Sequence, residues 1–259
     1  IAALTIYPYP YTPMESQQHS HYSQALDREM TYKTYGTEGR PVLVFASQSG
    51  HWYDYENFGM TEVVRPWIEA GKIRLICADS IDEETWSSHG DGRRRIMQQE
   101  RWYHYITDEL IPAVRRTPDE TFITTGCSMG GYHCVNFFCR RPELFDTVIA
   151  LSGIYRASFF FGDYADDLTY DNSPQDYLEN MPADHPYLDI YRQKRIILCV
   201  GQGAWEEDLL ASTREMDRIF HKLDVPAWVD YWGYDVAHDW LWWRRQLPYF
   251  MEKVVPLND

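Results

Sequence analysis

Five short runs suited to buried strands, separated by stretches with helical spacing, constrain the fold of this chain more than any other feature. The runs cover residues 41–47, 72–80, 121–126, 145–153 and 195–201. Each run is short enough for a buried strand, and most of the segments between them are long enough for a helix. Strands and helices that alternate in this way form parallel sheets with helices on both faces. The sequence therefore predicts an α/β fold built on a mostly parallel central sheet.

Further elements complete this pattern at both ends of the chain. An edge strand is predicted at 28–36 and a last strand at 227–233. Helices are predicted at 58–70, 96–116, 132–142, 206–225 and 240–254. A chain of 259 residues with 44% hydrophobic residues can bury a substantial core in one domain, which we expect over residues 25–259. Residues 1–24 are rich in Tyr, Pro, Ser and Gln and lack periodicity, which favours an extended N-terminal arm.

A long acidic and aromatic segment at 154–194 interrupts the alternation between two core strands. Loops of this length in a compact domain are usually functional or disordered, and the aromatic content argues against disorder. We expect a cap-like insertion over the sheet, with Phe159, Phe160 and Phe161 lining an apolar substrate pocket. The alternative is that these rings only pack the long loop onto the domain.

Charge excludes several classes of partner. The formal net charge is −15, whereas nucleic acids and anionic membranes require clustered Lys and Arg. The one dense basic run, at 93–95, is interpreted as the solvated start of a helix. No charged-then-apolar leader opens the chain, and no apolar run approaches the roughly 18 residues of a membrane span. We therefore expect neither a nucleic-acid nor a membrane partner, whereas a homo-oligomer is compatible with the sequence.

The cysteines indicate free thiols. Five are scattered along the chain, without the spacing of a zinc site or of a disulfide framework. Most lie inside apolar stretches, so we expect buried, reduced side chains and prefer a cytoplasmic location. No metal ion is predicted.

A candidate nucleophile lies directly after the strand at 121–126. The stretch GCSMG at 126–130 matches G-x-S-x-G, and a predicted helix follows it. This motif needs a strand, a sharp turn and a helix in that order, with small neighbours around the strained serine. The start of the helix also provides free N–H groups and partial positive charge for a developing oxyanion. The pattern predicts Ser128 as a nucleophile, and a glycine-rich turn with an incidental serine is the alternative.

The candidate base is His238. In sheets of this type the catalytic order along the chain is serine, acid and histidine. Of nine histidines, only His238 follows the last predicted strand, in the loop before the final helix. Such loops at the carboxyl ends of strands are where ligands and catalytic groups gather.

Three consecutive carboxylates compete for the role of the acid. Glu206, Glu207 and Asp208 all follow the strand at 195–201. Glu206 lies nearest the end of the strand, whereas the other two are suited to the first turn of the next helix, where negative charge is stabilising. Only one of the three can face His238, because successive helical residues point about 100° apart. The sequence favours Glu206 and leaves Glu207 and Asp208 open.

Two backbone N–H groups are predicted to form an oxyanion hole. One belongs to Met129, the residue after the nucleophile. The other should come from the loop at 47–50 that follows the first apolar run, where Gln48 is preferred and Ser49 is the alternative.

Residues 126–155 and 232–250 resemble the putative-esterase branch of the α/β-hydrolases, which includes esterase D-like, feruloyl-esterase and mycolyltransferase domains. Weaker similarity covers 42–50 and 201–208, and the resemblance spans about residues 25–254. Ala204 stands where the usual acid loop of the family has Asp, which displaces the acid to Glu206; mycolyltransferase-like members also use Glu. The oxyanion loop lacks the common His-Gly or Asp-Gly pair.

The resemblance implies the α/β-hydrolase fold and either hydrolysis of esters or thioesters or acyl transfer, without a cofactor. We expect a serine esterase that hydrolyses a small carboxylic ester through an acyl-enzyme on Ser128. An acyltransferase that uses the same residues, and a non-catalytic binding or assembly protein on this scaffold, are the alternatives.

Overall fold

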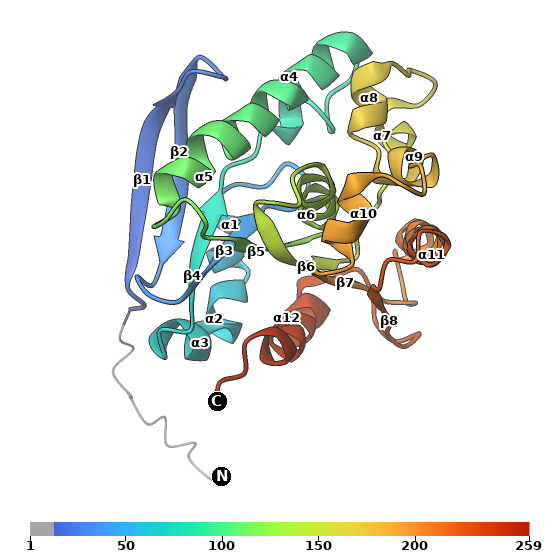
Figure 1. The fold of residues 1–259 in the computed structure, drawn as a ribbon. Helices are drawn as coiled ribbons and strands as arrows, with labels where there is room; N and C mark the ends of the chain where they lie inside the picture. Colours follow the sequence, from blue (N-terminus) through green and yellow to red (C-terminus); the bar gives the residue numbers. More distant parts are fainter. Residues whose placement is uncertain (1–12, 259) are drawn as a thin grey trace, which may run out of the picture.

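A mostly parallel sheet of eight strands runs through the computed structural model, which describes residues 13–258 (Figure 1). The strands are β1 (Ser16–Ser23), β2 (Arg28–Tyr35), β3 (Arg40–Phe45), β4 (Ile73–Ala78), β5 (Phe122–Cys127), β6 (Phe145–Leu151), β7 (Arg195–Val200) and β8 (Trp228–Tyr231). Their order across the sheet is β1-β2-β4-β3-β5-β6-β7-β8. The pairs from β4 to β8 are parallel, and β1 and β2 are antiparallel to their neighbours. The predicted α/β fold with a mostly parallel sheet is confirmed.

The edge of the sheet differs from the prediction. Residues 16–23, which the sequence assigned to an extended arm, form the edge strand β1, so β2 is the second strand and not the edge. The side chains of β1 are almost all polar, and no apolar alternation marks it as a strand. Its inward contacts are made by imidazole rings, because His19 stacks on Tyr32 at 4.7 Å and His21 packs edge-on against the same ring at 5.8 Å. Residues 1–12 of the predicted arm lie outside the described residues.

Helices cover both faces of this sheet. They are α1 (Asp54–Asn57), α2 (Met60–Val63), α3 (Arg65–Glu69), α4 (Gly92–His104), α5 (Ile111–Val114), α6 (Met129–Arg140), α7 (Ser158–Phe161), α8 (Asp167–Asp171), α9 (Pro174–Glu179), α10 (Pro186–Tyr191), α11 (Glu207–Lys222) and α12 (Trp240–Val254). A 3₁₀ turn, η1 (Asp82–Glu84), precedes α4, and a π-helical stretch, η2 (Tyr105–Leu110), continues it. The single helix predicted at 58–70 is two short helices, α2 and α3, instead. Gly59 at φ 75° separates α1 from α2, and Pro66 lies in the first turn of α3.

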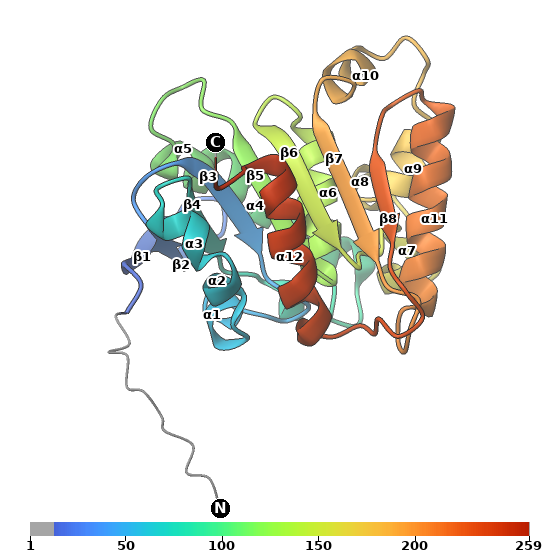
Figure 2. The same ribbon diagram turned by 90° about the horizontal axis from the view of Figure 1, so that it is seen from below.

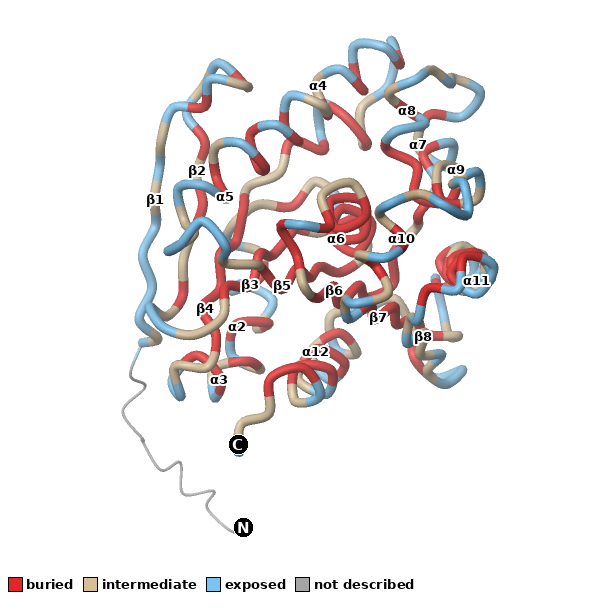
Figure 3. Tube along the Cα trace, in the orientation of Figure 1, coloured by how far each residue is buried: buried red, intermediate tan, exposed pale blue. Residues whose placement is uncertain are grey.

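Two hydrophobic clusters lie between the sheet and the helices that cover its two faces, and Figure 2 shows these helices. One lies between the sheet and the helices α4, α6 and α11, and the other lies under α2, α3 and α12. The tube in Figure 3 is red along most of β3 to β7 and mostly pale blue or tan along β1. Helix α6 is buried over all residues except Arg140, because it lies between the sheet and the insertion at 154–194. Burial on all sides fixes the position of the first residue of α6, which directly follows Ser128.

The insertion at 154–194 forms the four short helices α7 to α10. Only α7 lies near the carboxyl ends of the strands, whereas α10 lies at their opposite ends (Figure 2). The rest of the insertion packs along α6. The hydroxyl of Tyr132 donates to the carbonyl of Asn172 at 2.5 Å, and that of Tyr191 donates to the carbonyl of Cys139. The cap-like part is therefore confined to α7 and its neighbourhood.

The basic run at 93–95 is solvated only in part, which corrects the sequence-based interpretation. Arg95 is buried, and its guanidinium donates to the carbonyls of Thr85, Trp86 and Phe160. It also lies over the ring of Phe161 at 4.3 Å, and burial lowers the pKa of Arg95. Arg95 thereby attaches α7 to the body of the domain.

Candidate active site

The turn between β5 and α6 holds Ser128 in a strained conformation. Its φ is 58° and its ψ is −120°, a region that residues with a side chain rarely adopt. The two flanking glycines make room for this turn. A Cβ atom at Gly126 would lie 2.3 Å from the carbonyl carbon of Gly130, and one at Gly130 would lie 2.3 Å from the carbonyl oxygen of Phe45. The motif thus has the strand, turn and helix that a nucleophile elbow requires.

The structure brings together the three residues that the sequence nominated for catalysis. Oγ of Ser128 lies 2.9 Å from Nε2 of His238. Nδ1 of His238 lies 3.4 Å from Oε2 of Glu206, which is long for a hydrogen bond. Such contacts are often long in the absence of substrate and tighten when it binds. Imidazole positioned between a hydroxyl and a carboxylate can take the hydroxyl proton while the carboxylate fixes its tautomer.

Backbone contacts hold the two loops of the acid and the histidine against each other. The N–H of Gly203 donates to the carbonyl of Val236 at 2.8 Å, and the N–H of His238 donates to the carbonyl of Ala204 at 3.0 Å. A Cβ atom at Gly201 would lie 2.2 Å from the Val236 oxygen, so this approach requires glycine. Asp239 then caps α12, because its carboxylate accepts from the N–H of Leu241 at 2.7 Å.

Burial distinguishes the three candidate acids. Glu206 is 1% exposed, whereas Glu207 and Asp208 are exposed in the first turn of α11. The second carboxylate oxygen of Glu206 accepts from the hydroxyl of Ser152 at 2.7 Å. That hydroxyl in turn accepts from the indole N–H of Trp243 at 3.3 Å. Only Glu206 therefore faces His238 and has both carboxylate oxygens engaged.

Ser152 and Trp243 support this arrangement, and the sequence reading missed both. Ser152 follows β6 with a φ of 52°, and it is fully buried. The ring of Trp243 packs edge-on against His238, with the centroids 4.8 Å apart. A serine directly after a buried strand was the available signal for the first, whereas nothing local distinguishes Trp243 from the other tryptophans of α12.

The loop at 47–50 lies beside the elbow, where the sequence placed the second oxyanion donor. Gln48 and Met129 both line the cavity at Ser128. The N–H of Ser49 already donates to a carboxylate oxygen of Asp82 at 3.3 Å, which favours Gln48 over Ser49 as a donor to substrate. Ser47 anchors the loop to the elbow, because its hydroxyl donates to the carbonyl of Cys127 at 3.0 Å.

A cavity of about 220 Å³ opens at Ser128. Its wall is formed by Gln48, Ser128, Met129, Ile154, Phe159, Phe160, Trp205, Asp208, Leu209 and His238. Phe159 and Phe160 line it as expected, but Phe161 does not. The helical turn of α7 directs Phe161 into a buried cluster, where it packs edge-on against Trp86 at 5.1 Å. The expected trio of rings is therefore a pair.

Trp205 and Asp208 are two further lining residues that sequence analysis assigned no pocket role. Trp205 is 82% exposed and has a φ of 68°, which is unfavourable for a residue with a bulky side chain. Asp208 contributes a carboxylate to the rim, and among residues 13–258 no Lys or Arg lines this cavity. The aromatic residue within the acid loop was the available signal for Trp205.

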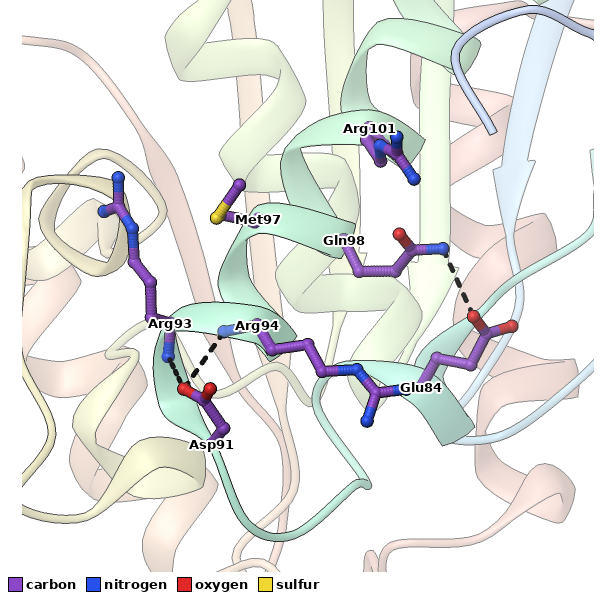
Figure 4. A pocket seen from close by; sticks show the side chains of 7 residues that line it. All are labelled: Glu84, Asp91, Arg93, Arg94, Met97, Gln98 and Arg101. Carbon is purple, nitrogen blue, oxygen red and sulfur yellow. Dashed lines mark hydrogen bonds between the residues drawn. The ribbon is translucent and has the colours of Figure 1, made fainter. Parts of the chain in front are cut away.

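A larger cavity of about 580 Å³ lies on the outer side of α4, away from these residues (Figure 4). Some of the polar groups in its wall form hydrogen bonds with one another. The carboxylate of Asp91 caps the helix by accepting from the N–H groups of Arg93 and Arg94, and Gln98 donates to Glu84 at 3.2 Å. Arg93 also forms ion pairs with Asp166 and Asp167. None of the proposed catalytic residues reaches this cavity.

The cysteines are unsuited to nucleophilic chemistry. All five are free and buried, and burial raises the pKa of each thiol. Cys127, which adjoins Ser128, has a pKa well above the ordinary value. Because the thiolate is the reactive form, these side chains are inert at neutral pH.

Within residues 13–258, no group of three or more His, Cys, Asp or Glu side chains is placed to hold a metal ion. In that same part of the chain, every helix is too short or too polar to cross a membrane.

The fold and the site together define a serine hydrolase with the α/β-hydrolase fold. A family model described as "Putative esterase" matches residues 23–252, and the chain belongs to this family of ester hydrolases. The family and fold that the sequence indicated are thereby confirmed. A search of curated proteins found no match.

Solved structures similar to this one support the fold. A ferulic acid esterase superposes with a TM-score of 0.73 at 16% identity, covering 94% of this chain and 98% of its own. An S-formylglutathione hydrolase from Staphylococcus aureus gives 0.70 at 14% identity, covering 94% and 97%. MPT51 of Mycobacterium tuberculosis gives 0.70 at 12% identity, covering 95% and 100%. At these identities the likeness establishes a shared architecture.

Proposed function

We propose that this enzyme hydrolyses a small carboxylic ester through an acyl-enzyme on Ser128, with His238 as the base and Glu206 as the acid. The observation that carries the proposal is the 2.9 Å contact between Oγ of Ser128 and Nε2 of His238, at a strained elbow that opens into a cavity. A hydroxyl paired with imidazole in this way is an activated nucleophile.

The reaction has two steps. The Ser128 hydroxyl attacks the ester carbonyl while His238 takes its proton, and the N–H groups of Met129 and Gln48 stabilise the oxyanion of the tetrahedral intermediate. The alcohol leaves with the proton from His238. Water then attacks the acyl-enzyme by the same route, with His238 again as the base, and releases the acid.

The cavity supports a substrate with a small, uncharged group at the serine. Its volume of about 220 Å³ lies below the range of roughly 300–1,000 Å³ typical of ligand pockets. Anionic groups are disfavoured by the apolar walls from Phe159 and Phe160 and by the carboxylate of Asp208, and no Lys or Arg of the described chain lines the cavity to offset them. Neutral esters with a short or planar acyl group fit these properties.

Replacing the acid tests the proposed roles. Glu206→Gln keeps the size of the side chain but removes the charge that stabilises the imidazolium, so turnover of a neutral ester should fall by roughly 10²–10⁴. Glu207→Gln is the matched control. Its side chain is exposed, and its loss should cost only the few tenths of a kcal/mol of a helix-end charge. Steady-state kcat for the two variants measures the difference.

Equal activity of the Glu206 and Glu207 variants would remove Glu206 from the mechanism. If Glu207→Gln lost activity while Glu206→Gln kept it, the acid would be Glu207 and not Glu206. Neither result would test the role of Ser128 as the nucleophile.

The two phenylalanines of the cavity should affect selectivity. Phe159→Ala should change the ratio of kcat/KM values on short and long acyl esters while the melting temperature stays the same, because this ring is 55% exposed. Phe161→Ala is the control. This ring is buried outside the cavity, so its loss should cost about 3–5 kcal/mol of stability and leave the ratio unchanged. An unchanged ratio for both Phe159→Ala and Phe160→Ala would show that these rings do not contact the substrate.

A further inference from the structure

A buried pair of ionisable side chains lies behind the oxyanion loop and has no part in the proposed triad. Nε2 of His133 lies 3.0 Å from Oδ1 of Asp82, and both side chains are 1% exposed or less. Aromatic rings surround the pair, with Trp102 at 4.8 Å and Phe45 at 5.9 Å from the imidazole. Burying such groups is costly and seldom adds net stability, so the pair requires another explanation.

The second oxygen of Asp82 points to the oxyanion loop. It accepts from the N–H of Ser49 at 3.3 Å, at a residue with a φ of 54°. Ser87, which follows η1, adds two contacts to the same loop. Its Oγ lies 2.9 Å from the hydroxyl of Ser49 and accepts from the side-chain amide of Gln48 at 3.1 Å. The segment from Asp82 to Ser87 therefore contacts the loop at Gln48 and Ser49, whereas the elbow contacts it at Ser47.

The imidazole connects this segment to the helix that carries the other donor. His133 lies four residues after Met129 in α6, one helical turn further along the same face. A continuous path thus joins the two N–H groups of the oxyanion hole: from Met129 along α6 to His133, through Asp82 to Ser49, and to the adjoining Gln48. Nδ1 of His133 has no hydrogen-bond partner within residues 13–258, so Asp82 is the polar contact that fixes this ring.

We infer that Asp82, held by His133, and Ser87 are positioning residues that set the distance between the Gln48 and Met129 N–H groups. The inference rests on the proposed function, since it concerns how that site binds a developing oxyanion. Donors stabilise an oxyanion only when they lie about 2.7–3.1 Å from its final position. A loop released from Asp82 loses this placement, although the triad itself stays intact.

Asp82→Ala is the first variant to measure. It removes the acceptor of the Ser49 N–H, and kcat on a neutral ester should fall roughly 10–100-fold, below the 10²–10³ lost with a complete donor. KM should change less than about threefold, because the effect falls on the transition state. Asp82→Asn should keep at least tenfold more activity than Asp82→Ala. Its amide oxygen can accept from Ser49 while its NH₂ donates to the other tautomer of His133.

Binding of a transition-state analogue distinguishes a positioning role from a loss of stability. The affinity of a boronic acid that forms a tetrahedral adduct should fall in parallel with kcat/KM across the Asp82 variants. Glu100→Ala is the matched control. It removes a carboxylate on α4 that pairs with Arg140 at 2.8 Å. Arg140 is the last residue of α6, at the end far from the loop. The melting temperature of Glu100→Ala should fall while kcat and boronate affinity stay close to wild type.

Ser87→Ala provides a second test if Asp82→Ala fails to fold. It removes one hydroxyl from a partly exposed position, and kcat should fall roughly 2–10-fold, the equivalent of one hydrogen bond. Wild-type kcat and boronate affinity in Asp82→Ala or Ser87→Ala would overturn the inference while the proposed function stands. Loss of kcat without loss of boronate affinity would overturn it too. Ester hydrolysis that does not depend on Ser128 would instead reject the proposed function.

Discussion

Ser128→Ala should abolish ester hydrolysis, with a loss in kcat on the order of 10⁶. The substitution removes the atom that forms the acyl-enzyme, and no other hydroxyl from the described part of the chain lines the cavity. The fold should be unaffected. Ala at a φ of 58° is as strained as Ser, and within residues 13–258 the hydroxyl makes its one hydrogen bond to His238. Thermal unfolding should therefore show a change within about 0.5 kcal/mol.

Ser20→Ala is the matched control for this variant. Ser20 is exposed on β1, where its hydroxyl contacts Glu29 at 3.1 Å, and its loss should change neither activity nor stability. Retention of more than a few per cent of activity by Ser128→Ala would contradict the assignment of the nucleophile.

His238→Ala should lower kcat by about as much as loss of the serine, because the members of such a unit act together. Without imidazole, no group is placed to take the Ser128 proton: in the part of the chain that the structure describes, Nε2 of His238 is the side-chain partner of that hydroxyl. The expected loss is on the order of 10⁶ in kcat, measured with the same neutral ester.

A second histidine offers a control with the same chemistry. His221 also pairs with a carboxylate, that of Asp217 at 3.1 Å, but its side chain is 82% exposed on α11. His221→Ala should retain full activity. If His238→Ala kept substantial turnover, the base would have to be another group, and the order of residues along the chain would have misled the assignment.

Much of the fold followed from the sequence because burial on both faces leaves a continuous apolar signal. Strands β3 to β7 are nearly all buried, and each was predicted as a strand. The edge strand β1 carries polar residues on both faces, so its pairing with β2 depends on contacts that no local pattern reveals. The prediction of a single helix at 58–70 was wrong for a different reason. Its apolar spacing is real, but the helix breaks at Val64, between α2 and α3, just before Pro66 in the first turn of α3.

The candidate site was predictable where chain order and turn chemistry determine it. The elbow at Ser128 and the loop of His238 fall into this group. The choice among Glu206, Glu207 and Asp208 depended on which side chain points toward His238 at the start of α11. The burial of Glu206 and its contact with Ser152 give this direction in the structure. Contacts between distant segments were beyond the sequence. Arg95 was interpreted as solvated because nothing near it indicated that α7 would cover it.

Labelling with a fluorophosphonate, followed by peptide mapping, tests the central claim most directly. The reagent forms a stable adduct only with a serine that an adjacent base activates. One adduct is expected, on the peptide that contains Ser128; Ser128→Ala should eliminate it, and His238→Ala should slow its formation in proportion to the loss of kcat. An adduct on any other residue would contradict the account, as would an unlabelled protein that still hydrolyses esters.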